Sequence, residues 1–142
     1  MPQPPTDNEI RTILQRVRTI ALVGASARPD RPSHGVMQFL QGQGYRVIPI
    51  NPGRAGQTLL GETVRASLLD VHEPVDMVDI FRASDKVLPV VQDAITVGAG
   101  VVWMQVGVVN DEAAAAAAAQ GISVVMDRCP KIEFSRLGLT RL

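Results

Sequence analysis

The stretch ALVGASARPDRPSHGV, residues 21–36, joins an apolar run to a glycine and then to a loop that holds two prolines and two arginines. A strand that ends in glycine and leads into a helix is typical of dinucleotide-binding folds. However, Ser26 replaces the second glycine of the G-x-G-x-x-G pattern, and residues 25–32 separate Gly24 from the helix expected near Ser33. We therefore expect a phosphate-binding loop longer than the one that usually holds NAD.

Short apolar runs alternate with helix-like segments along the rest of the chain. The runs predict strands at residues 19–24, 45–50, 75–81, 100–107 and 122–127. Most of the runs are continuous, as in parallel strands that are covered on both faces. Between and before them we expect helices at residues 7–17, 33–44, 67–71, 84–98 and 110–121, with caps at Thr6 or Asp7, Ser33, Ser84, and Asn110 or Asp111.

This alternation predicts the fold class and the domain organisation. Strands that alternate with helices form a doubly wound α/β fold, here Rossmann-like with a five-stranded, mainly parallel sheet and helices on both faces. We expect a single domain over residues 1–142, with its core at about 19–137. The alanine run at 113–119 fits a helix that packs closely on the sheet, because alanine has the highest helix propensity.

The composition excludes several classes of protein. Fourteen Lys plus Arg balance fourteen Asp plus Glu, which argues against nucleic-acid binding and against a membrane surface. The apolar stretch 97–109 is too short to cross a membrane, and no targeting segment is evident, so we expect a soluble, cytoplasmic protein. One cysteine and two isolated histidines predict neither an internal disulfide nor a metal site.

Unusual residues follow each predicted strand. In parallel sheets the ligand binds beyond the carboxyl ends of the strands, so these residues should meet at one rim. A simple turn explains Asn51-Pro52-Gly53 equally well. The candidate rim residues are Gly24, Ala25 and Ser26, then Asn51, Pro52 and Gly53, then Phe81 and Arg82, then Gln105, Val106 and Gly107, and finally Asp127, Arg128 and Cys129.

The first loop has the chemistry of an anion site. The Ser26 hydroxyl can donate a hydrogen bond to a phosphate oxygen, and Arg28 and Arg31 can add charge-assisted bonds. The helix expected from Ser33 points its free N–H groups at the same space. We expect this loop to bind a pyrophosphate. In the alternative interpretation, the two arginines are ordinary solvated surface residues.

The second predicted strand argues against NAD. NAD-binding domains generally place Asp or Glu at this strand end to bond the ribose 2′-hydroxyl. Here the chain reads PINPG and supplies no carboxylate. Arg54 could meet an additional phosphate, so a phosphorylated adenosine ribose, as in NADP, is compatible.

The ordered motifs VGAS…PDRPSHGV, GYRVIPINP, VDMVDIF, VVWMQVGV and DRCPKIE resemble the stand-alone CoA-binding protein family, whose members are similar to the N-terminal domain of the succinyl-CoA ligase alpha subunit. The resemblance runs from about Thr19 to Leu137. It implies that Gly24, Ala25 and Ser26 approach the CoA phosphates and that Arg31 and Ser33 support them. It also implies that Asn51 and Pro52 border the adenosine and that Phe81, Arg82 and Gln105 line the continuing groove. Arg28 in the first loop and Gly107 after the fourth predicted strand complete the candidate cofactor site.

Two functions from different classes fit these residues. The first is non-catalytic binding of coenzyme A or an acyl-CoA, a small-molecule ligand. The second is an enzyme, either an NAD(P)-linked oxidoreductase or a CoA-ligase-like fragment. The fragment would need a partner chain, because the resemblance would imply a phosphohistidine domain and an ATP-grasp subunit, and we expect neither within these residues. A homodimer and an unidentified protein partner both remain open.

Cys129 and Trp103 each have two competing interpretations. Positive charge from Arg128 could favour the thiolate of Cys129, whereas a buried and inert cysteine fits its common behaviour as a small apolar residue. Trp103 lies within a predicted strand and is expected in the core, and a platform on which a ligand stacks is the alternative. Gln105, two residues later on the same face and nearer the rim, is the better candidate to contact a ligand.

Overall fold

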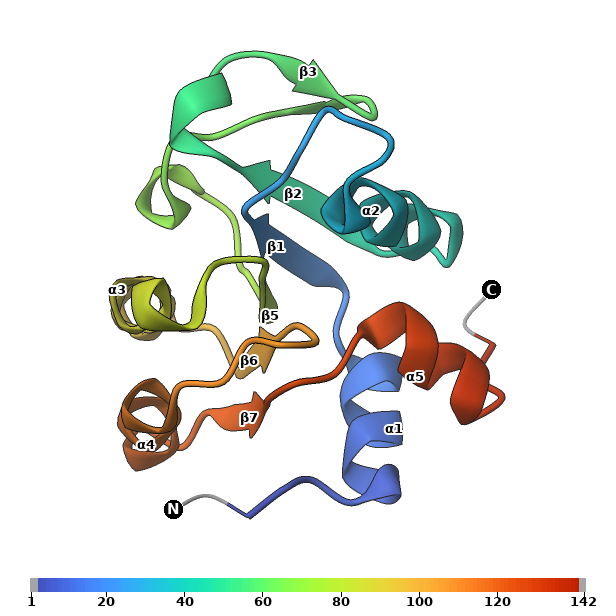
Figure 1. The fold of residues 1–142 in the computed structure, drawn as a ribbon, viewed down its shortest axis with the longest axis vertical. Coiled ribbons are helices and arrows are strands. Elements are labelled where there is room, and N and C mark those ends of the chain that lie inside the picture. Colours follow the sequence, from blue (N-terminus) through green and yellow to red (C-terminus); the bar gives the residue numbers. More distant parts are fainter. Residues whose placement is uncertain (1–2, 141–142) are drawn as a thin grey trace.

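A computed structural model describes residues 3–140, and its centre is a five-stranded parallel sheet (Figure 1). The strand order is β2-β1-β5-β6-β7, and each neighbouring pair is parallel. The strands are β1 (Thr19–Val23), β2 (Arg46–Ile50), β5 (Met77–Ile80), β6 (Val101–Met104) and β7 (Ser123–Val125). The chain runs outward from β1 to β2 and then returns to the other side of β1, so the strand order reverses between β1 and β5. The prediction of a doubly wound, Rossmann-like α/β fold is confirmed.

Helices cover both faces of the sheet (Figure 1). One layer contains α1 (Asp7–Arg16), α2 (Pro32–Gly42) and α5 (Pro130–Arg136). The other contains α3 (Val87–Val97) and α4 (Asp111–Ala119). Each layer buries its own apolar cluster against the sheet, so the parallel strands are shielded from water on both sides.

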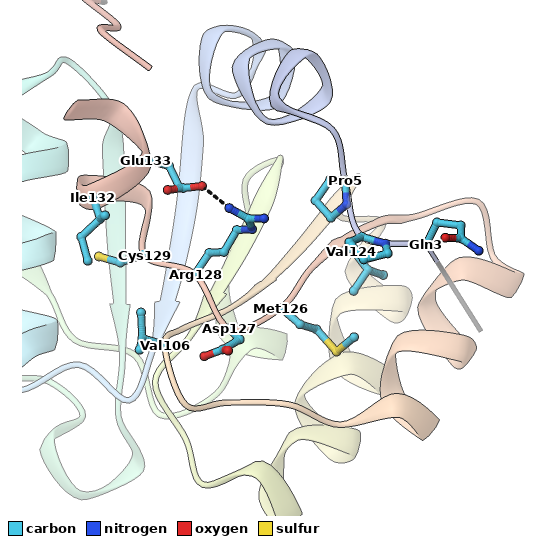
Figure 2. Close-up of a pocket in the computed structure, with 11 residues that line it drawn as sticks. Gln3, Pro5, Val106, Val124, Met126, Asp127, Arg128, Cys129, Ile132 and Glu133 are labelled. Atoms are coloured by element: carbon cyan, nitrogen blue, oxygen red, sulfur yellow. Dashed lines mark hydrogen bonds and ion pairs between the residues drawn. The ribbon is translucent and has the colours of Figure 1, made fainter. Parts of the chain in front are cut away.

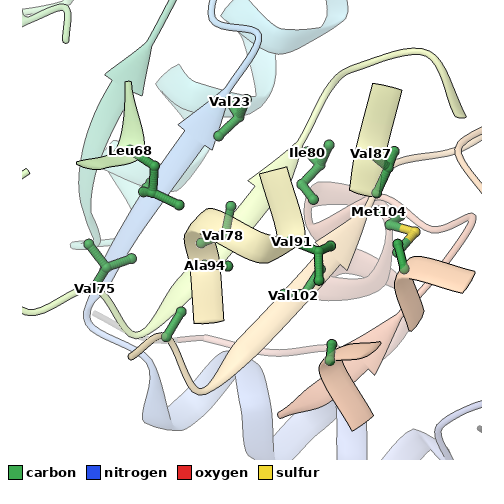
Figure 3. Packing of buried hydrophobic residues seen from close by; sticks show 14 of the residues in the cluster. Val23, Leu68, Val75, Val78, Ile80, Val87, Val91, Ala94, Val102 and Met104 are labelled. Carbon is green, nitrogen blue, oxygen red and sulfur yellow. The ribbon is translucent and has the colours of Figure 1, made fainter. Parts of the chain in front are cut away.

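The alanine-rich helix α4 shows how the second layer is packed. Ala113, Ala114 and Ala117 lie on one face and are completely buried, which lets α4 approach β6 and β7 closely. Beside it, Val91 and Ala94 of α3 pack over the sheet (Figure 3). The predicted helix at residues 110–121 is confirmed.

Two of the four predicted helix caps are correct. Thr6 accepts a hydrogen bond from the backbone N–H of Glu9 and forms a capping box with it, and Asn110 accepts from Ala113. The prediction for Ser33 is wrong: α2 begins one residue earlier, at Pro32, whose fixed φ suits the first helical position. The prediction for Ser84 is also wrong, because its hydroxyl bonds backbone groups of another loop, accepting from Val109 N (3.0 Å).

The connection between β2 and β5 also differs from the expectation. The helix expected at residues 67–71 is only a 3-10 turn at Leu68–Asp70. Before it, the chain forms another 3-10 turn at Pro52–Arg54 and an unpredicted hairpin of β3 (Thr58–Leu59) and β4 (Glu62–Thr63). The helix α5 was not predicted either. Within residues 3–140, no helix combines the length and the apolar character that a membrane span requires.

Candidate functional site

Gly24 lies at the point where the strand order reverses. Its φ of +92° is in the left-handed region, and a Cβ there would lie 2.2 Å from the carbonyl oxygen of Phe81. The N–H groups of Gly24 and Ala25 both donate to the carbonyl of Ile50, over 3.0 and 3.2 Å. The glycine is therefore needed where β1 passes close to the end of β5, and these two amides are engaged within the protein.

A cavity of about 880 Å³ opens beyond the carboxyl ends of the strands. Residues that follow all five parallel strands contribute to its lining. Ten of the twelve predicted site residues line it: Gly24, Ala25, Ser26, Arg28, Arg31, Ser33, Asn51, Phe81, Arg82 and Gln105. The structure thus brings together residues that are far apart in the sequence.

Two predicted site residues, Pro52 and Gly107, are not among the residues that line the cavity. Pro52 begins an exposed 3-10 turn. The N–H of Gly107 donates to the Asp127 carboxylate over 2.7 Å, and its carbonyl accepts a hydrogen bond from Ser84. Gly107 therefore helps to join three loops at the rim.

The cavity concentrates positive charge. Its lining includes four arginines and neither aspartate nor glutamate. Arg28 pairs with Asp30 over 3.0 Å, and both side chains are largely exposed. Within residues 3–140, the guanidinium groups of Arg31, Arg54 and Arg82 have no hydrogen bond or ion pair. Since the whole chain has a formal net charge of zero, this cluster is a local feature suited to an anion.

Asn51 holds the first loop against the end of β2. Its Nδ2 donates to the carbonyl of Ala25 over 2.8 Å, and its Oδ1 accepts from Gly53 N over 2.9 Å. Within the loop, the Ser26 hydroxyl accepts from the N–H of Arg28 over 3.1 Å and keeps its own proton for another acceptor. Asn51 thus supports the loop in addition to bordering the cavity, a role that the sequence did not indicate.

A buried carboxylate lies beneath the cavity. Gln105 is 5% exposed, and its Nε2 donates to Oδ1 of the fully buried Asp79 over 2.8 Å. The other carboxylate oxygen of Asp79 has no partner among the residues that the structure describes. Burial raises the pKa of Asp79 to about 7, against the lowering effect of the hydrogen bond from Gln105. Asp79 was not among the predicted site residues, although its carboxylate inside the apolar run 75–81 was a usable signal.

Cys129 is a buried thiol at one end of the cavity. Burial raises its pKa, and the charge of Lys131 opposes this only weakly. Arg128 does not face the thiol, since its guanidinium donates to the Glu133 carboxylate over 2.6 Å. The hypothesis of a charge-favoured thiolate is therefore wrong, and the interpretation as a buried cysteine is confirmed.

Trp103 is in the core, as predicted. Its side chain is completely buried, and its indole N–H donates to the carbonyl of Arg128 over 2.8 Å. The side chain of Glu133 is 5% exposed, and its carboxylate accepts hydrogen bonds from both Arg128 and Arg136. The bond from Arg128 to Glu133 anchors α5 next to the site.

A doubly wound sheet with a positively charged cavity at its carboxyl edge is typical of domains that bind nucleotide cofactors. The chain belongs to the family described as CoA binding domain, whose model matches residues 18–135. The resemblance that the ordered motifs suggested is confirmed.

The relatives of the chain are similar over most of its length. The uncharacterized protein YneT of Bacillus subtilis (strain 168) is 41% identical over 130 residues, which cover 92% of this chain and 95% of that protein. A hypothetical protein from Pyrococcus horikoshii OT3 is 38% identical with a TM-score of 0.90, covering 98% of this chain and 99% of that one.

A larger protein contains a similar domain. The dinucleotide forming acetyl-coenzyme A synthetase 1 of Ca. Korarchaeum cryptofilum, solved with phosphate and ADP, is 27% identical with a TM-score of 0.70. The match covers 84% of this chain but only 28% of that protein. The similarity to the synthetase therefore concerns a part of that protein.

Proposed function

We propose that the protein binds coenzyme A or an acyl-CoA in the cavity at the carboxyl edge of the sheet, without catalysing a reaction. The observation that carries the proposal is the cluster of four cavity arginines without a neighbouring carboxylate in the lining. CoA has a pyrophosphate and a ribose 3′-phosphate, so it offers several anionic groups to such a cluster. Membership in the CoA binding domain family supports this ligand.

The distribution of residues in the cavity suggests how CoA lies. Ser26, Arg31 and Arg54 belong to the end formed by the loops after β1 and β2, and this end suits the phosphates. Val106 and Ile132 belong to the opposite, apolar end, which suits the pantetheine arm. We propose that Phe81, Arg82 and Gln105 line the path between these ends.

The lining also favours a binding protein over an enzyme. The side chains that could act as an acid, base or nucleophile are Cys129, whose pKa is raised, and the hydroxyls of Ser26 and Ser33. The lining includes no histidine and no carboxylate to activate them. In a CoA-ligase-like assembly, a partner chain would have to supply such groups.

Calorimetric titration with CoA, NAD, NADP and ATP tests the proposal. We expect saturable binding of CoA, and weaker binding of NAD because Asn51 stands where a carboxylate would bond its ribose. Preferential binding of NADP would favour the oxidoreductase alternative, with Arg54 at the additional phosphate. Absence of CoA binding at millimolar concentration, together with clear binding of NAD, would overturn the proposed function.

A further inference from the structure

A second cavity of about 370 Å³ lies beside the edge strand β7 (Figure 2). It is bordered by the segment before α1, by the end of β7 and by α5. The side chains of Pro5, Val124 and Met126 give this cavity a largely apolar surface.

The two cavities are neighbours. Val106, Cys129 and Ile132 line both of them, and we call these three residues the shared wall. Val106 is 60% exposed and Ile132 is 57% exposed, which is unusual for large apolar side chains in one small area. Figure 2 shows the three side chains at one end of the second cavity, with Asp127, Arg128 and Glu133 drawn beside them. The shared wall therefore offers apolar contacts that continue from one cavity into the other.

The charged groups of the second cavity are engaged within the protein. Arg128 bonds the carboxylate of Glu133 over 2.6 Å. Asp127 accepts from the N–H of Gly107 over 2.7 Å. Unlike the first cavity, the second cavity offers no unpaired guanidinium group to a ligand. Its lining therefore suits an uncharged aliphatic group, whereas a terminal carboxylate would lose its hydration there without gaining an unpaired cation as a partner.

We propose that the second cavity accepts the acyl chain of an acyl-CoA whose CoA moiety occupies the first cavity, with the thioester at the shared wall. The preferred acyl group is a straight, uncharged aliphatic chain. This inference rests on the proposed function, because the acyl chain reaches the second cavity only from a CoA bound in the first.

An acyl-chain series tests the inference. Dissociation constants are measured by calorimetry for CoA and its acetyl, butyryl, hexanoyl and succinyl thioesters. Each methylene that becomes buried should tighten binding by about fourfold until the cavity is filled. Succinyl-CoA should bind more weakly than butyryl-CoA. Equal affinities along the series, with CoA itself bound, would overturn the inference and leave the proposed function intact, whereas absence of CoA binding would overturn both.

A pair of variants separates the cavity from non-specific apolar binding. Val106→Asn places an amide on the shared wall and should weaken the binding of hexanoyl-CoA more than that of CoA. The dissociation constant of CoA divided by that of hexanoyl-CoA should therefore fall by several-fold. Val109→Asn is the control, since Val109 is 45% exposed in the same loop but is absent from the lining of both cavities. It should keep the wild-type ratio. An equal reduction in both variants would contradict the inference.

Discussion

Gln105, which lines the larger cavity, donates its amide hydrogen to the buried carboxylate of Asp79 over 2.8 Å. This contact joins the floor of the candidate site to the centre of the sheet, because β5 and β6 are neighbours. The bond leaves the amide oxygen of Gln105 free to accept from a ligand. Asp79 is therefore a positioning residue for Gln105.

The pKa of Asp79 predicts a dependence of stability on pH. Its carboxyl titrates near 7 in the folded protein and near 3.8 when unfolded, so the folded state holds the proton more tightly. Stability from this group is complete below about pH 4 and is lost as the pH rises to about 7, a change on the order of 2–4 kcal/mol. Asp79→Asn cannot titrate and should remove that slope.

Urea unfolding at pH 4.5 and pH 8 measures this effect. Raising the pH from 4.5 to 8 should lower the free energy of unfolding of the wild type more than that of Asp79→Asn. Asp85→Asn is the control, because Asp85 is exposed and outside the core. A parallel pH dependence in the wild type and Asp79→Asn would show that Asp79 does not titrate in this range.

The general position of the site could be predicted from the sequence, for a topological reason. Parallel strands place their carboxyl ends at one edge, so residues such as Ser26, Phe81 and Gln105 must meet there once the strands are recognised. Ten predicted residues line the cavity for this reason. Pro52 and Gly107 are absent from its lining, because a residue after a strand end can equally turn the chain away from the ligand.

Other features depend on contacts between distant segments. The hydrogen bond from Asn51 to Ala25 spans two loops, and no local pattern encodes it. The helix α5 was missed although Pro130 at its start and the apolar Phe134 are helix signals. Its position depends on Arg136, whose guanidinium donates to the carboxylate of Asp7 in α1, 129 residues away in the sequence.

Gly24→Ala should destabilise the fold and disturb the site. The new Cβ would lie 2.2 Å from the carbonyl oxygen of Phe81, and φ of +92° is unfavourable for alanine. We expect a loss of at least about 2 kcal/mol in the free energy of unfolding. Gly35→Ala is the matched control, since a Cβ at this position in α2 meets nothing within 4 Å. It should stabilise the helix by up to about 1 kcal/mol, and equal destabilisation by both variants would contradict this account.

Glu133→Gln should weaken the attachment of α5. Burial raises the pKa of Glu133, but hydrogen bonds from Arg136 and Arg128 outweigh it and hold the pKa below its ordinary value of 4.5. The ionised carboxylate thus stabilises the fold above about pH 4.5, and this stabilisation is lost as the pH falls below that value. At pH 7 we expect a loss of about 1–3 kcal/mol, reduced from that of a fully buried pair because both arginines are partly exposed.

Chemical denaturation at pH 7 and pH 3 checks the role of Glu133. The difference between the wild type and Glu133→Gln should be clear at pH 7 and should shrink at pH 3. Glu112→Gln removes an exposed carboxylate from the first turn of α4 and should cost less than about 1 kcal/mol. A difference that stays constant between the two pH values would show that the charge of Glu133 is unimportant.

In the proposed function, the unpaired arginines of the larger cavity bind the phosphates of CoA. The most direct measurement is calorimetric titration of CoA and dephospho-CoA into the wild type, Arg31→Ala and Arg16→Ala, the last being an exposed arginine outside the cavity lining. Arg31→Ala should weaken CoA binding by roughly 1.5–3 kcal/mol, as expected for a lost charge-assisted bond. The loss should be confined to CoA if Arg31 meets the 3′-phosphate and shared by both ligands if it meets the pyrophosphate. Wild-type affinity of Arg31→Ala for both ligands, or an equal loss in Arg16→Ala, would contradict the claim.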